Sequence, residues 1–326
     1  MTPLPGLFTI RRMLAPRTLC LAFLGCALSA VQAQQATQSV QAQQQAALPQ
    51  RIQGGLASNS AISSDSFAPA SPSDSDIGVQ AILQPVQKYQ PFSAWTNWNV
   101  FWTSNAQLLD NTNRGSDTFL AGTVGGGYMP SLGGNLFADF SAEQGMYRYA
   151  RNSSLDFNST ELKAGLLYVV RQLGDLALFS DYTYDMLSSR GLNSQIYGSQ
   201  TWSVGARKVF TLSRAHLFYT SASADFALGG EPSYAVRNNF SALVGYQCNL
   251  TRMLRLDLYY CASAQDYRFT DRADFNQLIG GGLTLQVTKW LGIQAISTMA
   301  INNSTDSTYT YFAANLGGGL GIMVNF

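Results

Sequence analysis

The sequence has few charged residues and no long uninterrupted apolar run. Only 12% of its 326 residues are charged, whereas soluble domains usually carry about twice that share. The formal net charge is +1, so the composition gives no electrostatic reason to expect nucleic-acid binding. No segment reaches the ~18 continuous apolar residues that a membrane-spanning helix needs. This combination is typical of a transmembrane β-barrel, in which only alternate residues meet lipid.

Cysteine and histidine are also scarce. Two of the four cysteines lie in the first 33 residues, which leaves Cys248 and Cys261. The expected hairpin register sets Cys248 opposite Leu256 and points the two thiols to opposite faces, so we expect two free cysteines. The sequence contains neither a Cys/His metal-ligand spacing nor a phosphate-binding loop. We therefore expect no cofactor and no metal site.

The first residues have the pattern of a secretory signal. Arg11, Arg12 and Arg17 form a basic region, residues 19–30 form a short apolar run, and small residues end at Ala33. This pattern predicts a signal peptide over residues 1–33, cleaved after Ala33. Lipidation at Cys26 is the alternative.

Residues 34–90 differ in composition from the rest of the chain. They are rich first in Gln and Ala and then in Ser, Ala, Pro and Asp. Such a segment cannot bury enough apolar surface to fold alone, so we expect a low-complexity periplasmic leader. Two alternatives are a plug formed by residues 77–89 inside a barrel and a short epitope for a periplasmic partner.

From residue 91 onward the chain repeats a period-two alternation, which predicts strands. The expected strands are residues 92–103, 118–128, 136–147, 160–170, 176–184, 200–210, 216–227, 239–250, 254–265, 275–287, 291–300 and 311–326. The connections between them alternate between short and long. An even strand number with this alternation predicts an antiparallel barrel of about 12 strands over residues 91–326, with short periplasmic turns and long external loops.

The last strand carries the most specific pattern. One parity is apolar or small up to the final residue, and it includes Ile322, Val324 and Phe326. This strand resembles the last strand of Gram-negative outer-membrane β-barrel proteins, which alternates in the same way and commonly ends in Phe. The family often has an aromatic residue where this chain has Val324. The resemblance implies outer-membrane lipid and the barrel assembly machinery as partners, with Phe326, Val324 and Ile322 as the membrane-insertion signal.

Alternation also assigns charged residues to the lumen face. They are Arg171, Arg207, Arg255, Lys163, Asp139, Asp257, Asp181, Asp185, Glu143, Glu161 and Asp225. Strand direction places the three arginines near the periplasmic end, where we expect them to select anions at a constriction. In the alternative, the aspartates pair with these cations and the barrel interior is filled.

Three glycine triplets lie within the strands, at residues 125–127, 280–282 and 317–319. Glycine in a strand often marks a bend or a close backbone approach. We expect barrel curvature there, with a smooth wall for a plug or an extended solute as the alternative.

The resemblance to small monomeric channels of this architecture implies passive passage of small polar or anionic solutes. The alternatives are a closed structural or surface-recognition barrel and an autotransporter translocator, for which residues 34–90 are a short passenger. Outer-membrane phospholipases carry a His-x-Ser pair, but here His216 is followed by Phe218 at the second position. We therefore expect that the protein is not an enzyme.

Overall fold

The computed structural model describes residues 90–108, 115–190, 194–213 and 215–326. The predicted signal peptide, with Cys26, and residues 34–89 of the predicted leader lie outside the described residues.

The described chain is almost entirely β-structure. The strands are β1 (Phe92–Thr103), β2 (Asp117–Tyr128), β3 (Ser131–Gly133), β4 (Leu136–Tyr149), β5 (Phe157–Val170), β6 (Leu176–Ser189), β7 (Gln195–Thr211), β8 (His216–Glu231), β9 (Arg237–Asn249), β10 (Leu254–Tyr267), β11 (Ala273–Gln286), β12 (Leu291–Ser304) and β13 (Tyr311–Asn325). Four single-turn 3₁₀ helices lie in the connections: η1 (Ser153–Leu155), η2 (Arg171–Leu173), η3 (Ser233–Ala235) and η4 (Ser307–Tyr309).

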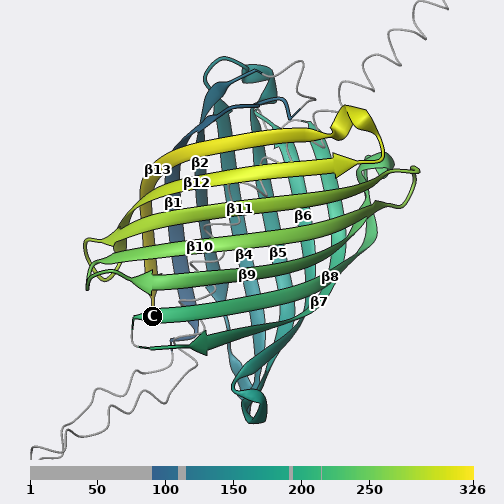
Figure 1. Cartoon of the computed structure of the whole chain (residues 1–326). Coiled ribbons are helices and arrows are strands. Elements are labelled where there is room, and N and C mark those ends of the chain that lie inside the picture. Colours follow the sequence, from purple (N-terminus) through teal and green to yellow (C-terminus); the bar gives the residue numbers. More distant parts are fainter. Residues whose placement is uncertain (1–89, 109–114, 191–193, 214) are drawn as a thin grey trace, which may run out of the picture.

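The strands close into a single antiparallel barrel (Figure 1). Each long strand pairs with the next in the chain, β2 pairs with β4, and β1 pairs with β13 to complete the ring. Twelve strands make the wall, and β3 is a short extra strand paired only at the start of β4. The predicted architecture is therefore confirmed, apart from β3.

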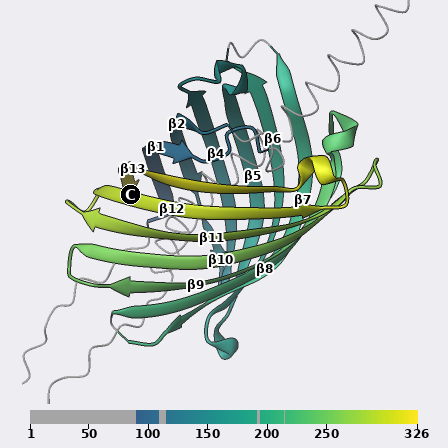
Figure 2. The same cartoon turned by 45° about the horizontal axis from the view of Figure 1, so that its top comes forward.

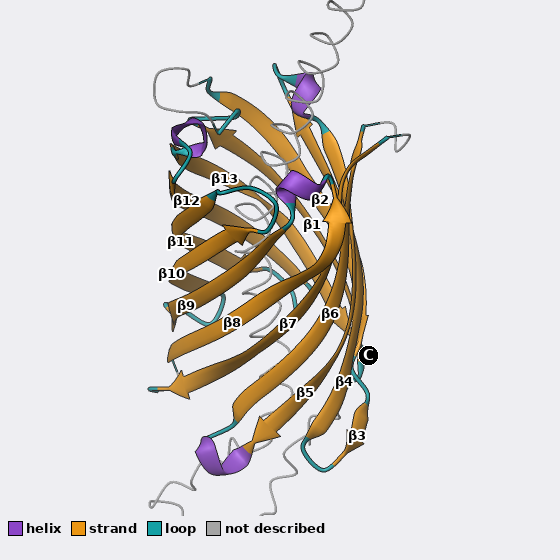
Figure 3. Ribbon diagram, turned by 90° about the vertical axis from the view of Figure 1, so that its right-hand side faces the viewer, coloured by secondary structure: helices purple, strands orange, loops and turns teal. Residues whose placement is uncertain are grey.

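The two ends of the barrel differ in their connections. At one end, here called the short-turn end, a few residues join β5 to β6, β7 to β8, β9 to β10 and β11 to β12. At the opposite end, here called the long-loop end, lies the longest connection, between β1 and β2, together with η1, η3 and η4 (Figure 3). The lengths alternate less than predicted, because the strands extend into the expected loops: five residues join β6 to β7, β8 to β9 and β10 to β11, as many as join β5 to β6.

The predicted register of the cysteine hairpin is confirmed. Cys248 in β9 lies opposite Leu256, and Cys261 in β10 lies opposite Leu243. Both cysteines are free, because odd and even positions of paired strands face opposite sides of the wall.

The outer surface of the wall is apolar. In β5, Leu162, Leu166 and Tyr168 point outward and remain about half exposed, and similar apolar residues follow on the other long strands. Leaving so much apolar surface in water is unfavourable by about 25 cal/mol per Å². A belt of this kind is therefore matched to lipid.

Within the described ranges, none of the helical turns is long and apolar enough to cross a bilayer.

Aromatic side chains fill part of the interior towards the long-loop end. Tyr147 and Phe157 stack with ring centroids 4.3 Å apart, and Phe119 stacks between Phe101 and Tyr149 at 5.3 and 5.1 Å. These rings belong to one buried cluster on β1, β2, β4 and β5. This sector of the wall is packed and leaves no room for solute.

Glycines of the triplets lie against inward-pointing aromatic rings of the neighbouring strand. A Cβ at Gly125 would lie 2.6 Å from the indole of Trp95 on the neighbouring strand. A Cβ at Gly280 would overlap the ring of Tyr259 in the same way. A side chain at either glycine would therefore collide with the ring of the neighbouring strand.

The seam between β1 and β13 is fully paired. The backbone N–H of Phe92 donates to the carbonyl of Phe326 at 3.1 Å, and the N–H of Phe326 donates back at 3.0 Å. The two rings stack with centroids 5.9 Å apart. The ends of the barrel chain therefore lie side by side at the short-turn end (Figure 2).

Candidate functional site in the barrel lumen

A cavity of about 870 Å³ lies within the barrel. Tyr128, Met129 and Trp290 line it at the short-turn end, and Tyr197 and Arg237 line it towards the long-loop end. The cavity therefore runs along the barrel axis and reaches strand ends at both sides.

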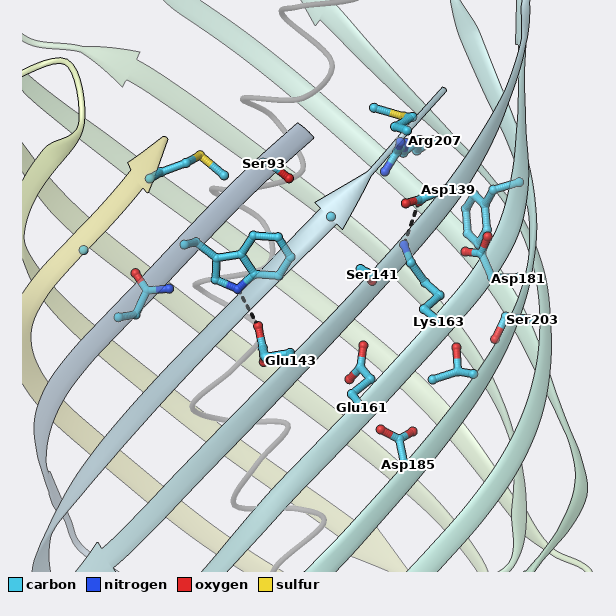
Figure 4. A pocket seen from close by; sticks show the side chains of 18 of the residues that line it. Ser93, Asp139, Ser141, Glu143, Glu161, Lys163, Asp181, Asp185, Ser203 and Arg207 are labelled. Atoms are coloured by element: carbon cyan, nitrogen blue, oxygen red, sulfur yellow. Dashed lines mark hydrogen bonds and ion pairs between the residues drawn. The ribbon is translucent and has the colours of Figure 1, made fainter. Parts of the chain in front are cut away.

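The two halves of the cavity wall differ in charge. From β4 to β8 the lining is mostly charged, and Figure 4 shows this side. The residues there are Asp139, Glu143, Glu161, Lys163, Asp181, Asp185, Arg207 and Asp225. From β9 to β13 the lining mixes amide, hydroxyl and apolar side chains, and its charged members are Arg237, Arg255 and Lys289. A solute in the cavity would therefore meet a wall rich in charged residues facing a wall with few of them.

Three carboxylates form a row across the charged wall. Glu143 in β4 lies opposite Glu161 in β5, which lies opposite Asp185 in β6. Figure 4 shows them side by side, pointing into the lumen. The indole N–H of Trp95 donates to Glu143 Oε2 at 2.8 Å, which fixes one end of the row. This arrangement makes that level of the lumen acidic.

The cations of the lumen lie beside aspartates. Lys163 Nζ contacts Asp139 Oδ2 at 2.7 Å, and Arg255 Nε contacts Asp257 Oδ2 at 3.0 Å. Two of the lumen cations, Lys163 and Arg255, therefore pair with aspartates, although the cavity remains.

Two of the predicted lumen residues do not line the cavity. Arg171 lies in η2 and is exposed, because the chain leaves the strand at Val170 and the alternation of β5 ends there. Asp257 is only 3% exposed and is covered by its partner Arg255. Neither Arg171 nor Asp257 therefore belongs to the cavity lining, contrary to the expectation.

Some lining residues were not foreseen from the sequence. Arg237 opens β9 at the long-loop end, two residues before the strand that alternation predicts. Lys289 lies in the turn between β11 and β12. Both positions lie outside the predicted alternating segments, so the period-two pattern gave no signal for them.

Other singled-out residues occupy structural positions. His216 begins β8 at the short-turn end, with Nδ1 2.5 Å from Tyr246 Oη, which fits the expected rim position. Phe326 and Val324 lie on the outward parity of the seam and are well exposed. Among the residues described, no three His, Cys, Asp or Glu side chains are grouped so that they could hold a metal ion.

Comparisons with known proteins give only distant structural neighbours. No protein-family model matches the sequence, and no curated protein matches it. An outer membrane channel from Pseudomonas putida F1 is 10% identical, with 72% of this chain and 96% of that chain covered and a TM-score of 0.48. The translocator domain of autotransporter NalP from Neisseria meningitidis is 13% identical, with 71% and 88% covered and a TM-score of 0.39. An anion-selective porin from Comamonas acidovorans is 9% identical, with 72% and 98% covered and a TM-score of 0.38.

These identities and TM-scores are too low to carry an argument about function. The fold assignment stands instead on the molecule itself. A closed antiparallel sheet with an apolar exterior and a polar lumen is the architecture of an outer-membrane β-barrel.

Proposed function

We propose that the protein is a passive outer-membrane channel for small polar solutes. The observation that carries this proposal is the polar cavity that follows the barrel axis to strand ends at both sides. In a barrel without such a cavity, side chains would fill the interior. A polar lining also replaces part of the hydration that a small solute loses on leaving bulk water.

We propose that the short turns face the periplasm and the long loops face the outside, as in other bacterial barrels. Residue 90, where the predicted leader joins the barrel, would then lie on the periplasmic side. A non-enzymatic role belongs to the same proposal, because passage through a lumen requires neither a nucleophile nor a base.

Arg207 and Arg255 are the candidate residues for charge selection, because both line the cavity. Asp257 contacts Arg255 directly, and Asp139 and Asp181 line the same cavity as Arg207. Whether the channel prefers anions or cations therefore depends on whether these arginines outweigh the nearby carboxylates. Replacing the two arginines removes positive charge from the lumen wall, so the variant channel should favour cations more than the wild type does.

Single-channel recording in a planar bilayer tests the proposal. We expect steady conductance from the protein purified from bacterial outer membranes. We also expect that Arg207→Ala with Arg255→Ala shifts the reversal potential in a salt gradient towards cations. Arg151→Ala, at the exposed long-loop end, is the matched control and should leave the reversal potential unchanged.

A closed structural or recognition barrel is the second candidate, favoured by the aromatic cluster that fills one sector of the interior. Electrical silence of protein whose folding is shown by heat-shifted gel mobility would favour it over the channel. Conductance with an unchanged reversal potential in the double variant would keep the channel and reject Arg207 and Arg255 as selectivity residues.

A further inference from the structure

Basic residues surround the short-turn end of the barrel. Arg171 lies in η2, Lys208 in β7 and Arg252 in the β9–β10 turn. These three residues are called the basic rim below. Among the charged side chains that the structure describes at this end outside the lumen, Asp175 is the one acid. The rim therefore carries an excess of positive charge.

Arg171 and Lys208 bring two cations to the same place. Lys208 points outward from β7, and its Nζ donates to the carbonyl of Leu173 at 2.6 Å. Leu173 ends η2, in which Arg171 is the first residue. Nζ also lies 4.9 Å from the centroid of the Phe210 ring, which holds the ammonium group against the outer wall. The Lys208 ammonium group thus lies at the outer edge of the barrel, close to the turn that carries Arg171.

Exposed apolar side chains accompany these cations. Leu173, Leu212 and Met253 are each about half exposed or more, and each lies within a few residues of a rim cation. A surface with apolar groups beside basic groups matches the interface of a bilayer, where acyl chains meet headgroups.

The long-loop end does not share this excess of positive charge. Arg272 there pairs with Asp274, and Arg190 Nη1 lies 3.6 Å from Asp156 Oδ2. Further acids, among them Asp266, Asp271 and Asp306, alternate with the arginines along those loops. The charge excess is therefore specific to one end and is not a general property of the loops.

We infer that the basic rim binds the anionic headgroups of phospholipids in the leaflet that surrounds the short-turn end. Phosphate oxygens pair with guanidinium and ammonium groups, while the acyl chains of the same lipids contact the apolar residues beside them. A basic side chain close to an anionic membrane surface contributes about fivefold to association. The inference goes beyond the channel proposal and does not depend on conduction.

Tryptophan quenching by brominated lipids tests the inference. Protein from bacterial outer membranes is reconstituted into phosphatidylcholine vesicles that contain either brominated phosphatidylglycerol or brominated phosphatidylcholine. We expect phosphatidylglycerol to associate about fivefold more strongly in 0.1 M salt. The preference should largely disappear in 1 M salt, where the screening length is about 3 Å.

Matched variants locate the effect. Arg171→Gln with Lys208→Gln, and separately Arg252→Gln, should each reduce the preference at least twofold. Arg151→Gln with Arg190→Gln, at the long-loop end, should leave the preference for phosphatidylglycerol unchanged.

Equal association of the two lipids with wild-type protein would overturn the inference. A preference that survives both rim variants, or one that is lost in the long-loop variant, would also overturn it. The lipid preference of the wild-type protein and its dependence on salt are measured without any variant. The inference can therefore still be tested if one variant fails to fold. Conductance measured on the same samples separates failure of the rim inference from failure of the channel proposal.

Discussion

At the scale of single residues, the seam between β1 and β13 depends on Gly319, which has no side chain. Asn99 in β1 and Gln294 in β12 meet across Gly319 of β13, with Gln294 Nε2 donating to Asn99 Oδ1 at 2.8 Å. Both side chains are buried. A Cβ at Gly319 would overlap the carbonyl oxygen of Trp98, which is backbone and cannot rotate away.

Gly319→Ala should therefore destabilise the folded barrel by about 1–3 kcal/mol, the usual cost of overpacking. Gly229→Ala is the control, because a Cβ there meets nothing within 4 Å, and we expect a change within about 0.5 kcal/mol. Urea unfolding in detergent micelles, followed by tryptophan fluorescence, measures both. Equal stabilities of the two variants would contradict this account of the seam.

At the scale of elements, a buried ion pair anchors the ends of three strands. Arg272 lies between the rings of Tyr267 and Tyr309, 4.2 and 3.5 Å from their centroids. Its Nε donates to Asp274 Oδ1 at 2.8 Å, and Asn302 Nδ2 donates to Asp274 Oδ2 at 3.2 Å. These contacts join β10, β11, β12 and η4.

Arg272→Met should cost about 3–5 kcal/mol of unfolding free energy, because it leaves the Asp274 carboxylate buried without its charge partner. Arg272→Met with Asp274→Asn should recover part of that loss, since the uncompensated charge is gone. Arg151→Met at an exposed loop position serves as the control, with an expected change within about 0.5 kcal/mol. Chemical denaturation checks all three, and a double variant no more stable than Arg272→Met would argue against a buried-charge effect.

The sequence predicts the strands better than their ends. β1 has the predicted bounds, and every other long strand lies within a few residues of its expected segment. However, β7 begins at Gln195 and not at residue 200, and β8 continues to Glu231. Strands that extend beyond the lipid have polar residues on both faces, so the alternation that marks the lipid-facing part disappears there. The three residues of β3 are too few to show any period.

The lumen could be predicted only in part. The alternation of inward and outward positions correctly assigns Asp139, Lys163 and Arg207 to the cavity wall. This assignment needs only the sequence of one strand. The contact between Lys163 and Asp139 depends on how two strands are aligned. Arg171 was misplaced because a strand ends one residue before it. A period-two pattern within one strand therefore predicts neither which residues pair across strands nor where residues in turns lie.

At the scale of the whole molecule, the two free cysteines report on the two sides of the wall. Cys261 lines the lumen cavity, whereas Cys248 lies on the outward parity of β9. In a Cys248→Ser variant, a charged water-soluble methanethiosulfonate reagent should therefore react at Cys261 and lower the conductance in steps.

In a Cys261→Ser variant, the same reagent should leave the conductance unchanged, because the remaining thiol faces lipid. Mass spectrometry of the folded protein counts the labelled thiols. An unlabelled Cys261 in conducting protein would show that the conducting path does not pass that residue.

The paired seam has a consequence for chain order. Phe92 and Phe326 exchange backbone hydrogen bonds as the last pair of a hairpin would, so the break in the chain stands where one more short turn would fit. Every strand of the wall therefore has an antiparallel neighbour on each side, and the hydrogen bonding does not distinguish the first strand from the others. A brief linker from Phe326 to Pro91 would make the polypeptide circular, and reopening it at the β9–β10 turn would give a circular permutant with the same strand neighbours all round.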